Sequence, residues 1–221
     1  SNGVIIGSLT LYFEEENSIS LSDDFHVERQ LDHLAGTWNT NNHTVTIGAF
    51  LYATNGTKPR TIHLGSSKIV LPNSVASFRT NNSQTTVNSG TSHIYFTNAT
   101  GTNNGMLTNP NQAFYNVTFE GMSGFLNGGA TYNQVDFKGN GGINGDNVFK
   151  NLLFAPSKNY TFESGKTQKI SSLFSANTPQ CGGWSTVTSS ILNSKANLIA
   201  AAGVNINVSG IIMKDVSGSG G

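Results

Sequence analysis

The stretch AFYNVTFEGMSGFLNGGATYNQVDFKGNGGINGDNVFKNLLF, residues 113–154, contains one short pattern three times. Equivalent positions keep the same kind of residue, at a spacing of 18 and then of 17 along the chain. Four columns align in this way: Phe114, Tyr132 and Phe149; Val117, Val135 and Leu152; Phe119, Phe137 and Phe154; and Asn109, Asn127 and Asn144. Self-similarity at a fixed period indicates a repeat architecture, in which each unit buries its apolar side against the next.

A period this short cannot hold a helical hairpin or a propeller blade, but it suits one coil of a β-solenoid. Strands of successive coils lie about 4.8 Å apart. We therefore expect the aromatic and aliphatic columns to point into a continuous interior. The Asn column should form a ladder of stacked side-chain amides at a turn.

Other segments alternate polar and apolar residues, or are apolar over the length of a strand, as strands do: 43–47, 68–71, 93–96 and 204–208. Residues 65–71 match residues 90–96 at a spacing of 25, which implies longer coils in that part of the chain. A third version, at 165–170, again places a glycine and a polar stretch before an inward apolar residue.

Residues 194–202, SKANLIAAA, are the one segment rich in helix-forming residues. A strand is nevertheless favoured there, because Gly203 and the alternating VNINV follow at once. The sequence thus predicts an all-β chain throughout.

Charged residues make up 11% of the chain, against about 25% in an average domain. This suits stacked coils, because a column of identical charges would repel itself. Twelve basic and twelve acidic residues cancel, so we expect no nucleic-acid partner. No apolar run approaches the roughly 18 residues of a spanning helix, so we expect no membrane insertion. The single cysteine, Cys181, excludes an intramolecular disulfide framework.

Several segments resemble the β-helical repeat regions of very large secreted surface proteins from gliding bacteria of the Bacteroidetes type. They are GTWNTNNHTVTIG (36–48), RTIHLGSSKIVL (60–71), NSGTSHIYFTN (88–98), the triple pattern, YTFESGKTQKI (160–170) and IMKDVSGSGG (212–221). Those proteins include gliding-motility adhesins exported by the type IX secretion route. The resemblance covers roughly residues 20–221 and leaves out residues 1–19.

This resemblance implies a right-handed parallel β-helix on the cell surface, and the spacings give its coils a period of about 17–25. We expect residues 1–221 to form a single elongated segment of a much larger protein, with 1–19 as a capping or flanking strand region. Its role would be non-catalytic support of surface attachment or gliding. Its partners would be neighbouring repeats of the same chain and an extracellular surface or polysaccharide. The resemblance carries over no catalytic, cofactor-binding or metal-binding residue, and no cofactor is expected.

A carbohydrate-active or carbohydrate-binding β-helix is the main alternative. A hydrolase or lyase needs carboxylates on adjacent coils to act as acid and base, and the candidates are Glu120, Asp136, Lys138 and Asp146. Glu120 precedes Lys138 by one period, which predicts an exposed ion pair between them. Asp136 aligns with Thr118 and Leu153, so no acidic column forms, and we favour a structural role for these residues.

A metal site is a further possibility in the densest polar cluster, which comprises Asp23, Asp24, His26, Glu28, Asp32 and His33. Alternation along a strand places Asp24, His26 and Glu28 on one face. No glycine-bearing calcium loop surrounds them, and a solvated strand face has the same composition. We favour the solvated face.

The remaining candidates are isolated. His43, His63 and His93 lie in different strands without a matched partner. Cys181 has no nearby histidine to activate it, and the resemblance suggests a turn with Trp184 packed inward. An ice-binding solenoid needs a column of threonines that continues through many coils. Here Thr118 is followed by Asp136 and Leu153 at the matching positions of the next two coils, so no such column forms. The aromatic residues are expected to belong to the core, without an exposed array for stacking on a glycan.

Overall fold

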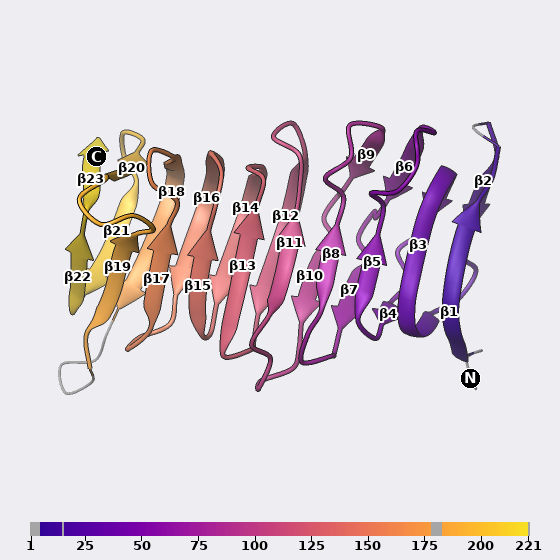
Figure 1. Ribbon diagram of the computed structural model, residues 1–221, viewed down its shortest axis with the longest axis horizontal. Coiled ribbons are helices and arrows are strands. Elements are labelled where there is room, and N and C mark those ends of the chain that lie inside the picture. The colour runs from indigo at the N-terminus through magenta and orange to yellow at the C-terminus, as the bar shows by residue number, and fades with distance from the viewer. Residues whose placement is uncertain (1–4, 15, 178–182, 221) are drawn as a thin grey trace.

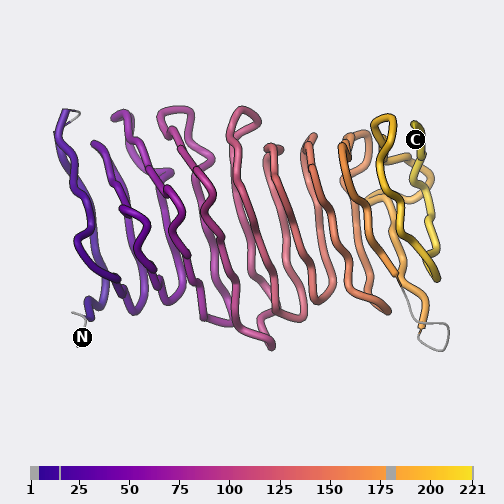
Figure 2. The backbone as a smooth tube through the Cα atoms, turned by 180° about the vertical axis from the view of Figure 1, so that it is seen from behind, coloured from indigo at the N-terminus to yellow at the C-terminus, as the bar shows by residue number. Residues whose placement is uncertain are grey.

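The computed structural model describes residues 5–14, 16–177 and 183–220, and these form twenty-three β-strands with no helix among them. The strands stack side by side along one long axis, with the N-terminus at one end and the C-terminus at the other (Figure 1). Seen from behind, the backbone runs in successive turns of one coil (Figure 2). Every strand pairing is parallel, which confirms the predicted parallel β-helix.

Each coil contributes to three faces. The first face starts with the beginnings of β1 (Ile5–Tyr12) and β3 (Phe25–Asn39). It continues through β4 (Val45–Ile47), β7 (Lys68–Leu71), β10 (His93–Phe96), β12 (Ala113–Phe119), β14 (Thr131–Phe137), β16 (Asn147–Phe154), β18 (Thr167–Asn177) and β21 (Asn205–Ser209).

The second face starts with the middle of β1 and β3. It continues through β5 (Phe50–Tyr52), β8 (Ser77–Arg79), β11 (Asn104–Leu107), β13 (Ser123–Asn127), β15 (Asn140–Ile143), β17 (Asn159–Phe162), β19 (Ser185–Ser189) and β22 (Ile211–Lys214).

The third face is built from two ladders. One joins β2 (Ser18–Ser20), the end of β3, β6 (Arg60–His63) and β9 (Thr85–Asn88). The other joins the beginnings of β12, β14, β16 and β18 to β20 (Ala196–Ala200) and β23 (Val216–Gly220). Residues 5–12 and 18–20, almost all of them before the region of family resemblance, thus form the first coil.

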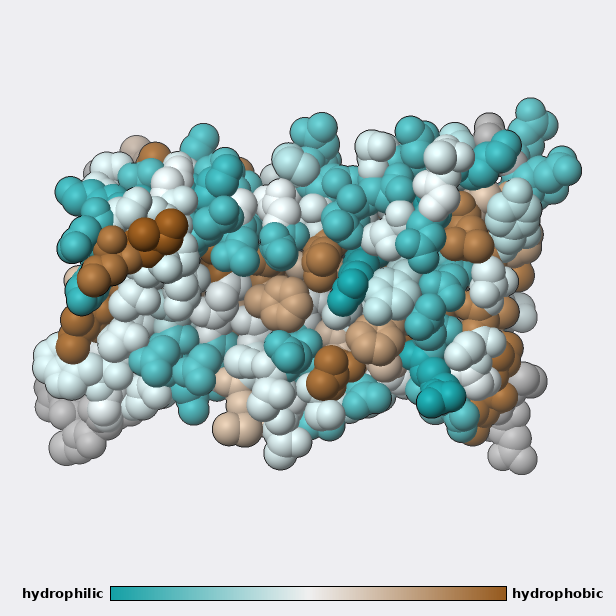
Figure 3. Space-filling view, in the orientation of Figure 1, coloured by the Kyte–Doolittle hydropathy of each residue, from teal (hydrophilic) through white to brown (hydrophobic). Residues whose placement is uncertain are grey.

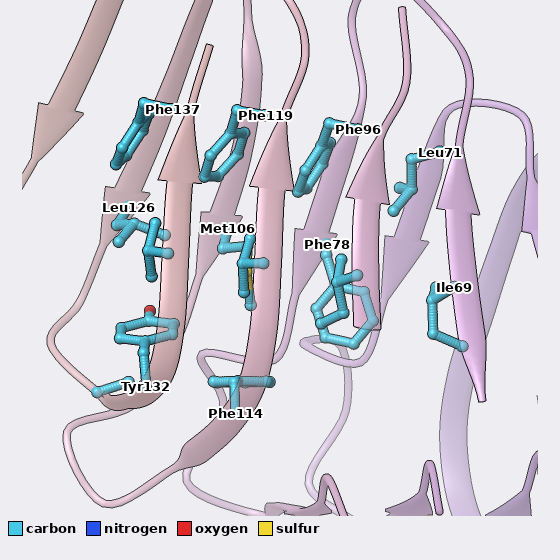
Figure 4. Packing of buried hydrophobic residues seen from close by; sticks show 14 of the residues in the cluster. Ile69, Leu71, Phe78, Phe96, Met106, Phe114, Phe119, Leu126, Tyr132 and Phe137 are labelled. Atoms are coloured by element: carbon cyan, nitrogen blue, oxygen red, sulfur yellow. The ribbon is translucent and has the colours of Figure 1, made fainter. Parts of the chain in front are cut away.

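The predicted interior columns are confirmed. Val117 pairs with Val135 and Val135 with Leu152, and all three are buried. Phe96, Phe119 and Phe137 form a row of nearly parallel rings, with centroids 4.7 and 4.9 Å apart (Figure 4). Phe154 continues this row with a tilted ring. These offset stacks follow from the preferred geometry of aromatic pairs and from the strand spacing.

The predicted Asn ladder is wrong. Asn144 stacks on Asn127 in the coil before it, as predicted. Asn127, however, pairs with Leu107 and not with Asn109. The Asn109 amide instead donates to the carbonyl oxygens of Thr80 and Asn82, because the turn before β12 is longer than the later turns.

A buried amide pair does exist elsewhere on the third face. The Nδ2 of Asn147 donates to Oε1 of Gln168 at 2.9 Å and to two carbonyl oxygens of its own turn. Its Oδ1 accepts from the N–H of Ala130 on the preceding coil. Both residues are at most 1% exposed, so this pair satisfies polar groups that water cannot reach.

The longer repeat is confirmed, since β7 pairs with β10 residue for residue at a spacing of 25. Gly65, Gly90 and Gly165 each have a positive φ, which explains why glycine opens this motif. Residues 196–200 are a strand, as favoured, and Thr167 pairs with Asn197, so that coil is longer than the central ones. Among the described residues there is no long apolar helix that could cross a membrane.

Candidate functional site

The outward side of the first face carries a row of polar and aromatic side chains on four consecutive coils, which we call the His93 row: Lys68, His93, Tyr95, Thr118 and Asp136. The Lys68 ammonium lies 4.8 Å from the centroid of the Tyr95 ring. The rings of His93 and Tyr95 stack at 3.6 Å, and Nε2 of His93 lies 2.8 Å from Oγ1 of Thr118. His93 thus has partners, contrary to the sequence-based expectation.

Burial, together with the nearby charge of Lys68, lowers the pKa of His93 to about 4, although Asp136 opposes the change. The imidazole is therefore neutral at neutral pH. A neutral ring can share a hydrogen bond with the Thr118 hydroxyl without a buried charge.

Asp136 and Lys138 form an ion pair, with Oδ2 and Nζ 2.7 Å apart. The hydrogen bond to Asp136 raises the pKa of Lys138, and the charge of Glu120 adds a smaller effect. The predicted Glu120–Lys138 ion pair is therefore wrong, because Lys138, which directly follows the end of β14, binds Asp136 of that strand instead. Asp146 lies on another face, where it accepts from the N–H of Thr167.

These four candidates therefore do not converge on one point. Asp136 and Lys138 bind each other. Asp146 lies in a turn, and its Oδ2 is 3.7 Å from Nζ of Lys166. The alignment of Asp136 with Thr118 and Leu153 is confirmed. Lys68 and Tyr95, and likewise His93 and Thr118, contact each other between neighbouring strands, while Asp136 binds Lys138 of its own coil. These contacts stabilise the outer surface of the solenoid.

The outward side of the second face carries a different group, which we call the aromatic strip: Gln30, Asp32, Phe50, Tyr52 and Arg79. The rings of Phe50 and Tyr52 lie parallel within 6°, with centroids 5.4 Å apart, and the Arg79 guanidinium lies 4.9 Å from the Tyr52 ring. The Nε2 of Gln30 donates to Oδ2 of Asp32 at 2.7 Å. Neither Oδ1 of Asp32 nor Nε of Arg79 has a hydrogen-bond partner among the described residues.

A hollow of about 430 Å³ adjoins this strip, lined by Ser8, Arg29, Gln30, Ala49, Phe50 and Asn73. Another, of about 420 Å³, lies at the neighbouring corner and is lined by His26, Glu28, Gly48, Pro72, Asn73 and Asn98. Figure 3 shows hydrophobic side chains in the middle of the molecule's surface as well as at its ends.

Sequence reasoning missed the aromatic strip because it assigned the aromatics to the core. A signal was present in Phe50-Leu51-Tyr52. Since side chains alternate along a strand, a buried Leu51 requires its two aromatic neighbours to point outward.

The predicted acidic and histidine cluster is also rearranged. Asp23 and Asp24 gather with His43 of the next coil, and their ligand atoms all lie within 4.8 Å of one another. Oδ1 of Asp24 accepts from the N–H of Thr44 and lies 3.8 Å from Nδ1 of His43. The turns of adjacent coils bring these residues together, which alternation within one strand cannot reveal.

The other members of that predicted cluster are dispersed. His26 and Glu28 line the corner hollow, and Asp32 belongs to the aromatic strip. His33 points into the interior, where burial and the nearby Arg60 charge lower its pKa to about 4. The six residues predicted from sequence therefore do not form one metal site.

Two further expectations concern isolated residues. His63 has a partner, since its Nδ1 lies 3.1 Å from Nδ2 of Asn88. Trp184 is 65% exposed, so the inward packing suggested by the resemblance is wrong. Cys181 lies outside the described residues.

Comparisons with protein-family models, with curated proteins and with solved structures find no match. The fold and its outer surface define the class of structure. It is a parallel β-helix whose first face carries a row of polar groups that bind one another, and whose second face carries an aromatic strip.

Proposed function

We propose that this chain is a non-catalytic rod segment of a secreted cell-surface adhesin that supports attachment or gliding. The observation that supports this best is the uninterrupted interior. Two apolar columns continue from coil to coil on the first face. One runs through Phe96, Phe119, Phe137 and Phe154, and the other runs through Val117, Val135, Leu152 and Phe174. A solenoid of this kind gains length by adding coils, because each coil contacts only its neighbours.

The outer surface supports the same proposal. The residues that could have served acid and base chemistry, Asp136 and Lys138, form an ion pair with each other. The repeat patterns that resemble those of type IX-secreted adhesins support the proposal of an extracellular location. Neighbouring repeats of the same polypeptide would then extend the rod at either end.

Surface location is tested by labelling intact cells of the source organism with an antibody raised against this segment. Labelling that disappears after brief protease treatment of intact cells is the expected result. Labelling seen only after lysis would contradict the proposal. A catalytic role is tested separately by incubating the protein with neutral and acidic polysaccharides, and chain cleavage that is lost in Asp136→Asn would overturn the non-catalytic assignment.

A carbohydrate-binding surface is a second candidate function, favoured by the aromatic strip and its hollow. Aromatic side chains present apolar surface, while Gln30, Arg29 and Asn73 supply hydrogen-bonding groups beside them. This combination suits a sugar, which has apolar C–H faces and many hydroxyl groups. The strands that carry the aromatic strip, β3, β5 and β8, are each paired on both sides, so a peptide could not bind there by adding a strand.

A glycan array with the isolated protein tests this second candidate. Binding should fall at least tenfold in Tyr52→Ala and remain unchanged in Tyr115→Ala, which removes an exposed aromatic side chain from the turn-proximal part of another strand. Equal binding by both variants, with unchanged circular dichroism, would exclude the aromatic strip as the sugar site.

A further inference from the structure

Beyond the aromatic strip, the second face carries a further outward aromatic side chain, Phe125 of β13. The outward position of Phe50 is followed on the next three coils by Ser77, Gly105 and Phe125. Phe125 is partly exposed and the next residue, Leu126, is buried, so the Phe125 side chain points outward. The same side of the rod therefore presents aromatic rings at Phe50 and at Phe125, three coils apart.

The Phe125 ring covers the backbone of Gly105 on the preceding coil. A Cβ at Gly105 would lie 2.1, 2.2 and 2.4 Å from three atoms of this ring, so glycine leaves the room that the ring needs. Because these three distances are nearly equal, the ring lies over the backbone with one face toward it and the other toward the outside. Phe125 thus provides a flat apolar platform that leans toward Phe50, and such a platform suits the C–H face of a sugar.

The separation of the two aromatic side chains suits several linked sugars. Successive coils lie about 4.8 Å apart, so the platform over Gly105 lies about 10 Å along the axis from Phe50. A linear polysaccharide advances by nearly one coil spacing per sugar, so a chain along the axis would place one sugar on each coil. Ser77, which lies between the two aromatics, is 3% exposed, so no exposed polar side chain interrupts the path at that position.

The hollow of about 430 Å³ adjoins the Phe50 end of this path. Tyr52 stacks on one face of the Phe50 ring, and Phe50 lines the hollow whereas Tyr52 does not. The opposite face of the Phe50 ring therefore opens into the hollow, where it can contact a sugar ring.

Two amide side chains in the hollow keep hydrogen-bonding groups available. The Nε2 of Gln30 donates to Asp32, whereas Oε1 of Gln30 has no partner among the described residues. The Oδ1 of Asn73 accepts from the N–H of Ser74, whereas Nδ2 of Asn73 has no partner in that part of the chain. One acceptor and one donor thus remain for the hydroxyl groups of a ligand.

The charge of the hollow is positive. Among the described residues that line it, Arg29 alone is charged at neutral pH, and its side chain is exposed. Arg29 forms no ion pair with any other described residue. Arg79 adds a second guanidinium to the aromatic strip, 4.9 Å from the Tyr52 ring.

The nearby acidic residues do not cancel this charge inside the hollow. Asp32 lies outside the hollow and accepts a hydrogen bond from Gln30. Glu28 lies on the other side of Asn73, where it lines the corner hollow. A carboxylate on a sugar would be attracted by Arg29 and repelled by Glu28, which fixes its position. Guanidinium and carboxylate also match in shape, because both are planar and can form two parallel hydrogen bonds.

We propose that the aromatic strip and Phe125 bind a linear polysaccharide that contains uronic acid. The polysaccharide lies along the axis of the rod, with one carboxylate at Arg29, one sugar against Phe50 and another on the platform of Phe125. This inference rests on the carbohydrate-binding candidate function given above and adds to it the charge and the direction of the ligand.

Isothermal titration calorimetry with two matched polymers tests the charge of the ligand. The first is polygalacturonate, and the second is the same polymer after chemical reduction of its carboxylates to primary alcohols. The wild-type protein should bind the acidic polymer more tightly. Arg29→Gln should weaken binding of the acidic polymer about tenfold, through the loss of a charge-assisted hydrogen bond, and leave binding of the reduced polymer unchanged. Lys169→Gln removes the same charge from an exposed position on the third face and should change neither affinity.

Phe125→Ala tests the direction of the ligand. It should weaken binding of both polymers, because the platform serves charged and neutral sugars alike, and circular dichroism should show an unchanged fold. Equal affinity for the two polymers, or equal losses for both in Arg29→Gln, would overturn the proposed acidic ligand and leave the carbohydrate-binding candidate standing. Unchanged binding in Phe125→Ala would overturn the axial path. If neither polymer and no glycan on the array binds, the inference and the candidate function both fail.

Discussion

Phe137 is the side chain whose removal tests the stacked interior most directly. It is fully buried, its ring stacks on Phe119 at 4.9 Å, and it meets Phe154 and Tyr160 edge to face at 5.9 and 6.2 Å. Phe→Ala in a core costs about 3–5 kcal/mol, through lost apolar contact and the cavity that remains. Since three aromatic contacts disappear together, we expect about 4 kcal/mol for Phe137→Ala.

Urea unfolding followed by circular dichroism measures this loss. For a chain of this length, about 4 kcal/mol lowers Tm by about 8–16 °C. The midpoint should fall with an unchanged slope if only stability changes. Tyr115→Ala, which removes an exposed aromatic ring from β12, should change the free energy of unfolding by about 0.5 kcal/mol at most. A loss below about 1 kcal/mol in Phe137→Ala would refute the stacked-column argument.

Three further changes test the buried amide pair, the His93 row and the close approach of coils. Asn147→Ala should lower the free energy of unfolding by about 2–4 kcal/mol, because it leaves buried donors and acceptors without partners. In the same urea titration, Asn133→Ala on the outer surface should cost under about 1 kcal/mol. Because the pKa of His93 is about 4 in the folded protein and 6.5 in the unfolded one, the unfolded chain binds more protons between these values. Stability should therefore fall as pH drops from about 6.5 to about 4, and His93→Gln should make this fall shallower; an identical pH profile would contradict the assignment. A Cβ at Gly48 would collide with the backbone carbonyl oxygen of Glu28 on the neighbouring coil, while a Cβ at Gly7 meets nothing within 4 Å. Thermal melts should therefore show that Gly48→Ala lowers the free energy of unfolding by about 3 kcal/mol or more, and that Gly7→Ala hardly changes it.

The columns of the central coils could be predicted because their period is nearly constant. With a spacing of 18 and then of 17 along the chain, Val135 must fall between Val117 and Leu152 once the coils stack. The same logic failed for Asn109, where an insertion in the turn shifts the register before the regular repeats begin.

The contacts between turns could not be predicted. His43 meets Asp24 because two turns of different length end at the same corner. Similarly, Lys138 pairs with Asp136, two residues before it in the same coil, and not with Glu120 one coil away. These choices depend on side-chain reach and turn geometry, which no spacing in the sequence encodes.

The sequence by itself determined that the chain is an all-β solenoid and which residues fill its central columns. Repetition makes each coil the template for the next, so apolar side chains at matching positions are buried by the same parallel stacking. Only the tertiary structure decided which aromatics face outward beside Arg79 and which polar groups meet between the turns of neighbouring coils, as His43 and Asp24 do. Those outcomes depend on how the irregular turns join neighbouring coils, which the spacing of the repeats does not encode.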